Sequence, residues 1–438
     1  MVPFGFAIVL AGLAVVGRAT AANWLAPVAF WPLVWAVLMG AAGLLQDVLP
    51  LQPQALWVIV SMLVAFQVGA LVVHYAQRSP TDTPGPYLDG ATLNTVARRL
   101  GRVTAFLSVL SATGVALLMF TGAAGAGIEL SLVGLLRLGN LLSIMRYTGV
   151  EDVPGLVRVF LYWTFSAALL GGMLAAVAET LPRRLLSVLP LFLAVAGGIV
   201  VASRSGFLLS GVMWVAGFWA VRVCTSGGTY DVFRVKWIAG ITVTVVGLIG
   251  LSVALLWLRA GIWRRLVVEV FVTTTVGDFF GSVSAFSTWL AVGDPVSPAL
   301  GAFTFAGPFD FFGLAPRLQG IYGTAVTFPS GLTSNIYTLF RGLIQDFGLA
   351  GAWGACLVGG AVSTIAYRQC VAGRVQWVVP LSLAYTLMLF SHLYSVFTHN
   401  SVVLGWLSAA LVWLWPTRIW STATGPEHLV GRQLEGPA

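Results

Sequence analysis

Long apolar runs, each close to the length needed to cross a bilayer, recur along almost the whole sequence. A hydrocarbon core about 30 Å thick is crossed by roughly 20 apolar residues in a helix, and only helices or closed barrels satisfy the backbone there. The runs are continuous rather than alternating, and 58% of the residues are hydrophobic against 9% charged. The sequence therefore predicts an all-α polytopic membrane protein. About eleven transmembrane helices are expected, near residues 3–17, 24–45, 56–75, 103–121, 156–178, 185–202, 206–221, 237–258, 347–366, 375–391 and 401–415.

The chain is expected to form a single transmembrane domain over residues 1–438. The first run lacks a basic segment before it and further spans follow, which favours a span over a signal peptide. Cys224, Cys356 and Cys370 have no metal-ligand spacing. Motifs of nucleotide hydrolases, zinc proteases and serine hydrolases are absent from the sequence. We expect no cofactor and no metal.

The distribution of arginine predicts the orientation. Of the 23 basic residues 22 are Arg, scattered at span ends, so the net charge of +8 indicates membrane topology rather than nucleic-acid binding. The basic connector 76–102 is assigned to the cytoplasm, which places the N-terminus outside and the tail 416–438 inside. This assignment puts 14 basic and 6 acidic residues inside, against 9 Arg and 9 acidic residues outside.

Two outer segments are long. Residues 122–155 have apolar positions at intervals of three and four, typical of an amphipathic helix at the interface. Residues 259–342 form a large periplasmic loop, in which Gly and Pro between apolar patches indicate re-entrant or interfacial helices roofing a cavity. Its many aromatic residues are explained by an interfacial belt or by platforms that stack sugars.

Outer arginines run against the positive-inside rule and are candidate ligands for an anionic substrate. Arg204 lies in the SRS turn between the sixth and seventh spans, where it either reaches a lipid headgroup or grips a diphosphate. Arg264 and Arg265 are adjacent on an expected helix, so only one of them faces a cavity. Anchoring at the interface is their alternative role.

The end of the large loop gathers further candidates for substrate binding. If 334–348 is helical, Tyr337 and Arg341 share one face, with Asn335 beside them and Tyr322 earlier in the loop. Asp346 lies nearer the opposite edge. It is either part of a structural ion pair that orients the loop or a base for a sugar hydroxyl.

Other groups that could accept a proton are His392 and His399, near the outer end of the tenth span, and Asp278 in the loop. A lone histidine at a span end is more often a satisfied interfacial residue.

Four motifs resemble, in their order, those of the bacterial oligosaccharide repeat-unit (O-antigen) polymerases of the Wzy type, relatives of the O-antigen ligases. They are the SRSG turn at 203–206, GDFFGSVSAF at 277–286, a strand-like GAFTF at 301–305, and SNIYTLFR(x)4DFGLAG at 334–351. The last is the most specific of them.

The resemblance implies a membrane glycosyltransferase (GT-C-like) architecture in the inner membrane, with an active site facing the periplasm. It implies an undecaprenyl-pyrophosphate-linked glycan as donor and a lipid-linked repeat unit as acceptor, with membrane lipids and a chain-length regulator protein as partners. Arg204 and an arginine of the large loop would hold the donor diphosphate. An acceptor hydroxyl would then displace it with inversion, without metal.

The sequence departs from the ligases at Ser334, where they carry His before the Asn. This favours a polymerase and leaves the base open among Asp346, His399, His392 and Asp278, in falling order. An O-antigen ligase remains an alternative. A transporter of a lipid-linked glycan is another, but it should show inverted repeats, which the sequence lacks.

Overall fold

The structure is a computed structural model of the whole chain. It describes residues 2–76, 90–129, 131, 134–135, 137–139, 141–142, 155–201, 205–232, 247, 250, 266–293, 298–315, 322 and 324–414, and of residues 90–92, 201, 266–276 and 278 the backbone alone.

Helices make up most of the described chain, which confirms the all-α prediction. Eight of them are long and apolar enough to cross a bilayer, so the chain is a multi-pass membrane protein. The elements are α1 (Val2–Ala21), α2 (Pro27–Leu44), α3 (Pro53–Ala76), α4 (Gly90–Ala126), α6 (Gly155–Val177), α7 (Leu181–Val201), α8 (Ser205–Thr225), α10 (Leu266–Val292), α11 (Ala306–Phe311), β1 (Val326–Thr327), β2 (Thr333–Ser334), α12 (Leu339–Val371), η1 (Val375–Trp377), α13 (Val378–Phe390), η2 (Val396–Thr398) and α14 (Asn400–Leu414).

Ten of the expected spans coincide with helices of the structure. Eight of these are the long helices α1–α4, α6–α8 and α12, and the other two are the shorter apolar helices α13 and α14. The expected span at 237–258 lies outside the described residues apart from Gly247 and Gly250. The number eleven and the GT-C-like arrangement therefore stay predictions.

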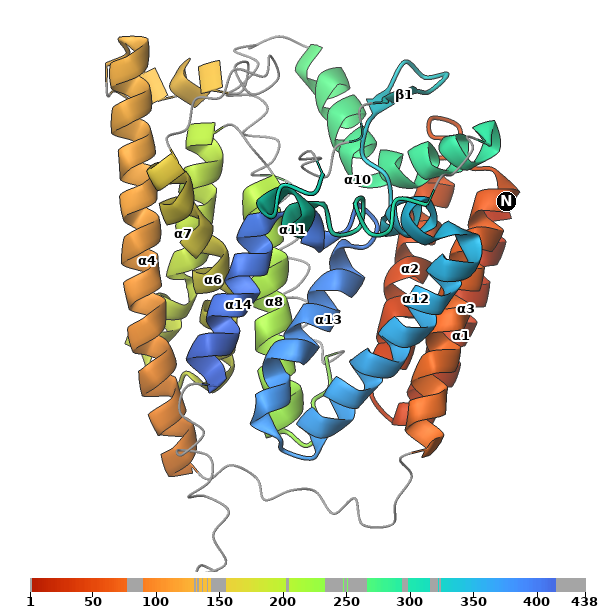
Figure 1. Cartoon of the computed structure of the whole chain (residues 1–438), viewed down its shortest axis with the longest axis horizontal. Coiled ribbons are helices and arrows are strands. Elements are labelled where there is room, and N and C mark those ends of the chain that lie inside the picture. Colours follow the sequence, from red (N-terminus) through yellow and green to blue (C-terminus); the bar gives the residue numbers. More distant parts are fainter. Residues whose placement is uncertain are drawn as a thin grey trace, which may run out of the picture.

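The helices run side by side, and their ends gather at two faces of the molecule (Figure 1). The end where α12 leads into α13 also holds the C-terminal ends of α3, α8 and α14 and the start of α4. Three hydrogen bonds tie these ends together: Arg99 Nη2 to Val412 O at 3.0 Å, Arg183 Nη1 to Asn94 Oδ1 at 2.7 Å, and Arg368 Nη1 to His74 O at 2.7 Å.

We call this the arginine-rich end, because nine of the twelve described arginines belong to it. The opposite end, which we call the site end, holds the other three. The nine are Arg18, Arg98, Arg99, Arg102, Arg183, Arg184, Arg222, Arg368 and Arg374, and the three are Arg137, Arg158 and Arg341.

Helix α4 corrects the extent of the expected cytoplasmic segment 76–102. The helix begins at Gly90 and has 37 residues, which makes it about 55 Å long, well beyond the thickness of a hydrocarbon core. Arg98, Arg99 and Arg102 therefore lie on helix rather than in a loop. Long basic side chains are compatible with this because their stems cover apolar surface while the charge reaches water.

The described part of the expected loop 259–342 contains α10, α11, β1, β2 and the start of α12. These elements lie at the site end, with α10 and α11 above α13 (Figure 1). Two buried serines of α10 attach it to the turn before α3. Ser284 Oγ donates to Pro50 O at 2.6 Å, and Gln52 N donates to Ser287 Oγ at 2.7 Å.

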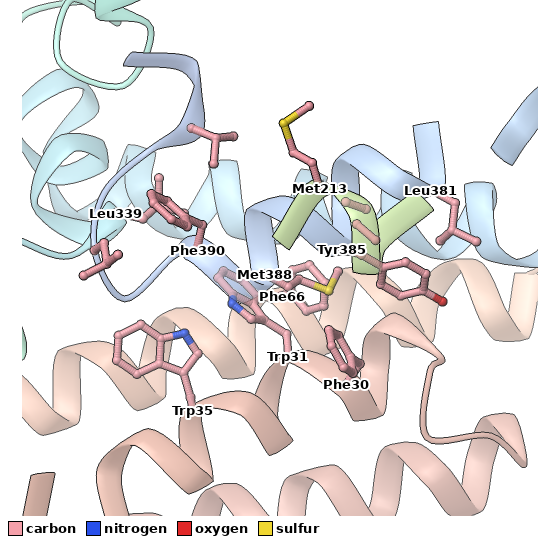
Figure 2. Packing of buried hydrophobic residues seen from close by; sticks show 14 of the residues in the cluster. Phe30, Trp31, Trp35, Phe66, Met213, Leu339, Leu381, Tyr385, Met388 and Phe390 are labelled. Carbon is pink, nitrogen blue, oxygen red and sulfur yellow. The ribbon is translucent and has the colours of Figure 1, made fainter. Parts of the chain in front are cut away.

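A buried aromatic cluster joins α2, α3, α12 and α13 beneath these elements (Figure 2). The indole N–H groups of Trp31 and Trp35 both donate to Ser391 Oγ, at 2.9 and 3.0 Å. Both rings also contact Phe340, with centroids 5.9 and 5.1 Å away. Leu339 N donates to Ser391 O at 2.8 Å. The start of α12 is therefore fixed to the end of α13 and to α2.

Helices α3 and α12 cross at two glycines. A Cβ on Gly69 would overlap the carbonyl oxygen of Leu357, and one on Gly360 would overlap that of Phe66. Small residues allow such close backbone approach within membranes, where association depends on packing.

We therefore expect Gly360→Val to separate α3 from α12 and to destabilise the protein by about 3 kcal/mol. Thermal unfolding in detergent, followed by loss of the monodisperse peak in size-exclusion chromatography, measures this. Gly354→Val is the matched control, because Gly354 is an exposed residue of the same helix and a Cβ there meets no atom within 4 Å. Equal melting temperatures for the two variants would contradict the crossing.

Candidate active site

The site end is organised by the first turns of α12. The supposition of helix over 334–348 is wrong at its start, because the helix begins at Leu339. Its other limit coincides with an interruption at Gly348, which has φ 67° and ψ 177°. Such a positive φ favours glycine. The part of α12 before Gly348 belongs to the site, and the expected ninth span begins beside this break.

A small hairpin precedes α12 and brings the tyrosines together. Strands β1 and β2 pair antiparallel, with Val326 opposite Ser334. Tyr322 N donates to Asn335 O at 3.3 Å, and Tyr337 Oη donates to Thr324 O at 2.9 Å. These bonds place the two rings with centroids 5.0 Å apart and nearly perpendicular, at 83°.

Arg341 lies among these rings and is 5% exposed. Its Cζ is 3.8 Å from the ring centroid of Tyr337, 4.0 Å from that of Tyr322 and 5.0 Å from that of Trp289 on α10. Its Nε donates to Gln345 Oε1 at 3.3 Å. A desolvated cation over aromatic faces gains about 2 kcal/mol at such contacts. We call Arg341 and the three aromatic residues Tyr322, Tyr337 and Trp289 the arginine cage.

The cage keeps Tyr322 protonated and holds the Arg341 guanidinium in one orientation. Burial raises the pKa of Tyr322, and the Arg341 guanidinium opposes that rise only in part. Tyr322 therefore stays a neutral hydrogen-bonding group at physiological pH. A guanidinium held by packing is preorganised, so it loses little entropy when it meets an anion.

Two buried polar groups at the cage lack hydrogen-bond partners among the described residues. They are Nε1 of Trp289, a member of the cage, and Oγ1 of Thr304 next to it. Thr304 Oγ1 and Tyr322 Oη both lie close to Gly342, because a Cβ built there would be 3.4 and 3.5 Å from them. Buried polar groups normally find partners. An oxygen-rich anion at the cage would supply acceptors for them and for the cation together.

Asp346 holds residues 299–304 over the arginine cage, and we call residues 299–311, through the end of α11, the covering segment. The Asp346 carboxylate is fully buried and accepts hydrogen bonds from Phe303 N at 2.9 Å and Thr304 N at 2.6 Å. Ala299 N and Leu300 N donate to the main-chain oxygens of Gln345 and Asp346, both at 3.1 Å. In an unbroken helix those oxygens would accept from residues beyond Gly348. The break in α12 therefore frees acceptors for the segment.

Residues 301–305 consequently form a turn, and the expectation of a strand there is wrong. Gly301 has φ 102° and the preceding Leu300 has φ 50°, which an extended strand does not permit. The Asp346 carboxylate is committed to two backbone amides, so this geometry favours a positioning role for Asp346 over proton transfer.

The covering segment continues to the loop before α14. Phe303 stacks on Tyr322 with centroids 5.8 Å apart, whereas Phe305 contacts Phe397 at 5.2 Å. In α11, Asp310 Oδ2 accepts from Asn400 Nδ2 at 3.2 Å. A short run of chain thus joins the arginine cage to the residues around His399.

Both candidate histidines lie at the site end. His392 Nδ1 is 3.1 Å from Leu389 O, so Nδ1 carries the proton, because a carbonyl only accepts. Burial lowers the pKa of His392 to about 4, which makes it a weak base. His399 Nε2 is 3.0 Å from Tyr394 Oη, and burial raises the pKa of Tyr394, so this tyrosine stays protonated beside the ring.

The structure brings together Tyr322, Tyr337 and Arg341, with Asn335 contributing its main-chain oxygen. Arg204, Arg264 and Arg265 lie outside the described residues, and Asp278 is on α10 with its side chain outside the description. Sequence reasoning missed Trp289 and Thr304 as parts of the site. Trp289 is one of the aromatic residues that the sequence assigns to an interfacial belt or to sugar stacking. Thr304 lies in the GAFTF motif at 301–305, where a threonine between two phenylalanines gives no sign of a binding role. Within the described part of the chain, no three His, Cys, Asp or Glu side chains gather as metal ligands.

Comparisons with models of protein families, with curated proteins and with solved structures found no significant match to this chain.

Replacing Asp346 by Asn tests its clamp on the covering segment. The amide oxygen can still accept one backbone N–H, but its NH₂ group then faces the other, so we expect a loss of about 2 kcal/mol. Limited proteolysis should show faster cleavage within 298–312, together with a lower melting temperature. Asp310→Asn is the control, because an amide oxygen there can still accept from Asn400. Unchanged cleavage in the Asp346 variant would rule out the clamp.

Stability should fall on acidification through His392. Its pKa is lowered from 6.5 to about 4 in the folded protein, so the unfolded chain binds the extra proton first. The stabilisation is complete above pH 6.5 and is lost progressively as the pH falls through 4, by up to about 3 kcal/mol. Melting temperatures of wild type and His392→Gln are measured between pH 7 and pH 4, and wild type should lose more stability than the variant over this range. A constant difference would contradict the shift.

Proposed function

We propose that the protein polymerises undecaprenyl-pyrophosphate-linked oligosaccharide repeat units into long-chain polysaccharide at the periplasmic face of the bacterial inner membrane. The single observation that carries this proposal is the arginine cage, a buried guanidinium fixed by three aromatic rings, where Trp289 Nε1 and Thr304 Oγ1 have no hydrogen-bond partner among the described residues. A diphosphate suits such a planar, multiply donating cation, because its oxygens accept hydrogen bonds in pairs.

The distribution of described arginines supports the orientation. Nine belong to the end opposite the cage, and the positive-inside rule assigns such an end to the cytoplasm. The cage then faces the periplasm, the side on which the resemblance to the Wzy-type polymerases places glycan assembly. The same resemblance supplies the lipid-linked donor and acceptor and the chain-length regulator as a partner.

In the proposed reaction an acceptor hydroxyl oxygen attacks the anomeric carbon of the donor glycan. The bond from that carbon to the diphosphate oxygen breaks, and the polyprenyl diphosphate leaves with the electron pair. Arg341 stabilises the charge that develops on this leaving group. The hydroxyl proton passes to a base, for which His399 and Asp278 remain candidates. One displacement inverts the anomeric configuration without a covalent enzyme intermediate.

Ser334 favours the polymerase over the ligase. Its side chain is buried, donates to Ile336 O at 3.1 Å and accepts from Ile336 N at 3.3 Å. It is therefore engaged in its own turn, at the position where the ligases carry their histidine.

Substitution of Arg341 tests the function in cells that lack the native gene. We expect Arg341→Ala to leave single-repeat glycan in place of long chains. Arg341→Lys should slow polymerisation about 100-fold, because an ammonium lacks the planar donor fork. Glycan length on gels and membrane levels of the protein are the measurements.

The control is Arg137→Ala, an exposed arginine at the same end, which should keep normal chain length. Long chains made by Arg341→Ala at wild-type levels would falsify the proposal. Purified protein in vesicles separates the alternatives. Longer lipid-linked glycans indicate a polymerase, transfer to a lipid A core indicates a ligase, and movement of substrate without a new glycosidic bond indicates a transporter.

A further inference from the structure

A second candidate site is an open cavity of about 210 Å³ lined by residues of α4, α6, α7 and the start of α8 and by His399. Its lining is mostly carbon, from side chains such as Val115, Leu161 and Phe165. The polar atoms of its wall are already bonded, since Ser210 Oγ donates to Gly206 O at 2.9 Å and Thr164 Oγ1 is 2.5 Å from Ser111 Oγ. The interior therefore suits a hydrocarbon rather than a polar ligand.

The cavity lies in the half of the bundle nearest the site end. It includes the first turns of α8, the last turns of α7 and the first three turns of α6. The walls are membrane-crossing helices, so bilayer hydrocarbon surrounds them. His399 marks its polar limit, and the adjacent Asn400 binds Asp310 of the segment that covers the arginine cage.

Its size and shape indicate which part of a lipid it takes. Pockets for whole small-molecule ligands begin at about 300 Å³, so this cavity accommodates only a stretch of chain. Gly197, Gly198 and Gly206 line it. At Gly206 a Cβ would meet no atom within 4 Å, so the missing side chain leaves open space in the α8 wall. A methyl branch of a chain fills such space, whereas a straight acyl chain leaves it empty and loses the contacts.

We propose that this cavity binds the headgroup-proximal isoprenoid chain of the lipid-linked substrate while the diphosphate reaches toward the arginine cage. The choice of a polyprenyl lipid rests on the proposed function. The geometry of the cavity does not depend on it. The covering segment connects the cavity with the arginine cage. Its Phe303 stacks on Tyr322 of the cage, and its Phe305 contacts Phe397, which lies near His399 of the cavity.

The test fills the cavity from two sides. In Gly206→Leu the new side chain grows from α8, where a Cβ meets no atom within 4 Å. In Gly197→Val it grows from α7, where a Cβ would be 3.5 Å from Val115 Cγ2, an ordinary contact. The control is Gly211→Leu on α8, which also has no atom within 4 Å of a Cβ and does not line the cavity.

The probe is a polyprenyl diphosphate with a diazirine in its first isoprene units, added to purified protein in phospholipid nanodiscs and read by mass spectrometry. We expect labelled peptides from α7 and α8, and labelling reduced about tenfold in Gly206→Leu and Gly197→Val, since excluding even two methylene groups costs that much affinity. Gly211→Leu should label as wild type does.

Competition experiments distinguish a polyprenyl chain from a phospholipid acyl chain as the occupant of the cavity. Unlabelled polyprenyl phosphate should abolish labelling, whereas phosphatidylethanolamine in equal amount should not. Equal competition by the phospholipid, or undiminished labelling in both cavity variants, would overturn the proposal. Labelling that behaves as expected in a protein that makes no glycan would instead leave the cavity assignment standing and remove the polymerase function.

Discussion

The arrangement of the site end depends on the interruption of α12 at Gly348. Because the helix breaks there, the carbonyls of Gln345 and Asp346 and the Asp346 carboxylate accept backbone N–H groups from residues 299–304. These hydrogen bonds stabilise the buried Asp346 carboxylate. The break thus converts the first turns of a membrane helix into the base on which the covering segment is built.

That segment gives the two candidate sites a shared support. Phe303 stacks on a ring of the arginine cage, and Phe305, two residues on, packs beside the loop that carries His399. The cage offers a fixed cation, and the cavity offers carbon surface between α4, α6, α7 and α8. An anionic lipid headgroup needs a cation, and its hydrocarbon tail needs carbon surface. One such lipid therefore matches both sites.

The sequence predicted the parts of this fold that depend on apolar length, and less of what depends on backbone contacts. The spans from α1 to α8 and from α12 to α14 follow from hydrophobic runs. The start of α4 was misplaced because its arginines are typical of a cytoplasmic loop. Arg341 could be predicted as a candidate because it is a basic residue on the outer side, against the positive-inside rule, and the tyrosines because they are its neighbours in the sequence. The role of Asp346 could not be predicted, because its partners are backbone amides, and every residue type except proline has one.

The crossing of α3 and α12 has a consequence for how the protein is made. Gly69 and Gly360 bring the two backbones together, yet residues 77–338 separate these helices along the chain. During synthesis α3 enters the bilayer long before its partner exists, and its glycine surface meets lipid until then. The seam beside the site is therefore closed only after most of the polypeptide has left the ribosome, so assembly of the site is a late event in biogenesis.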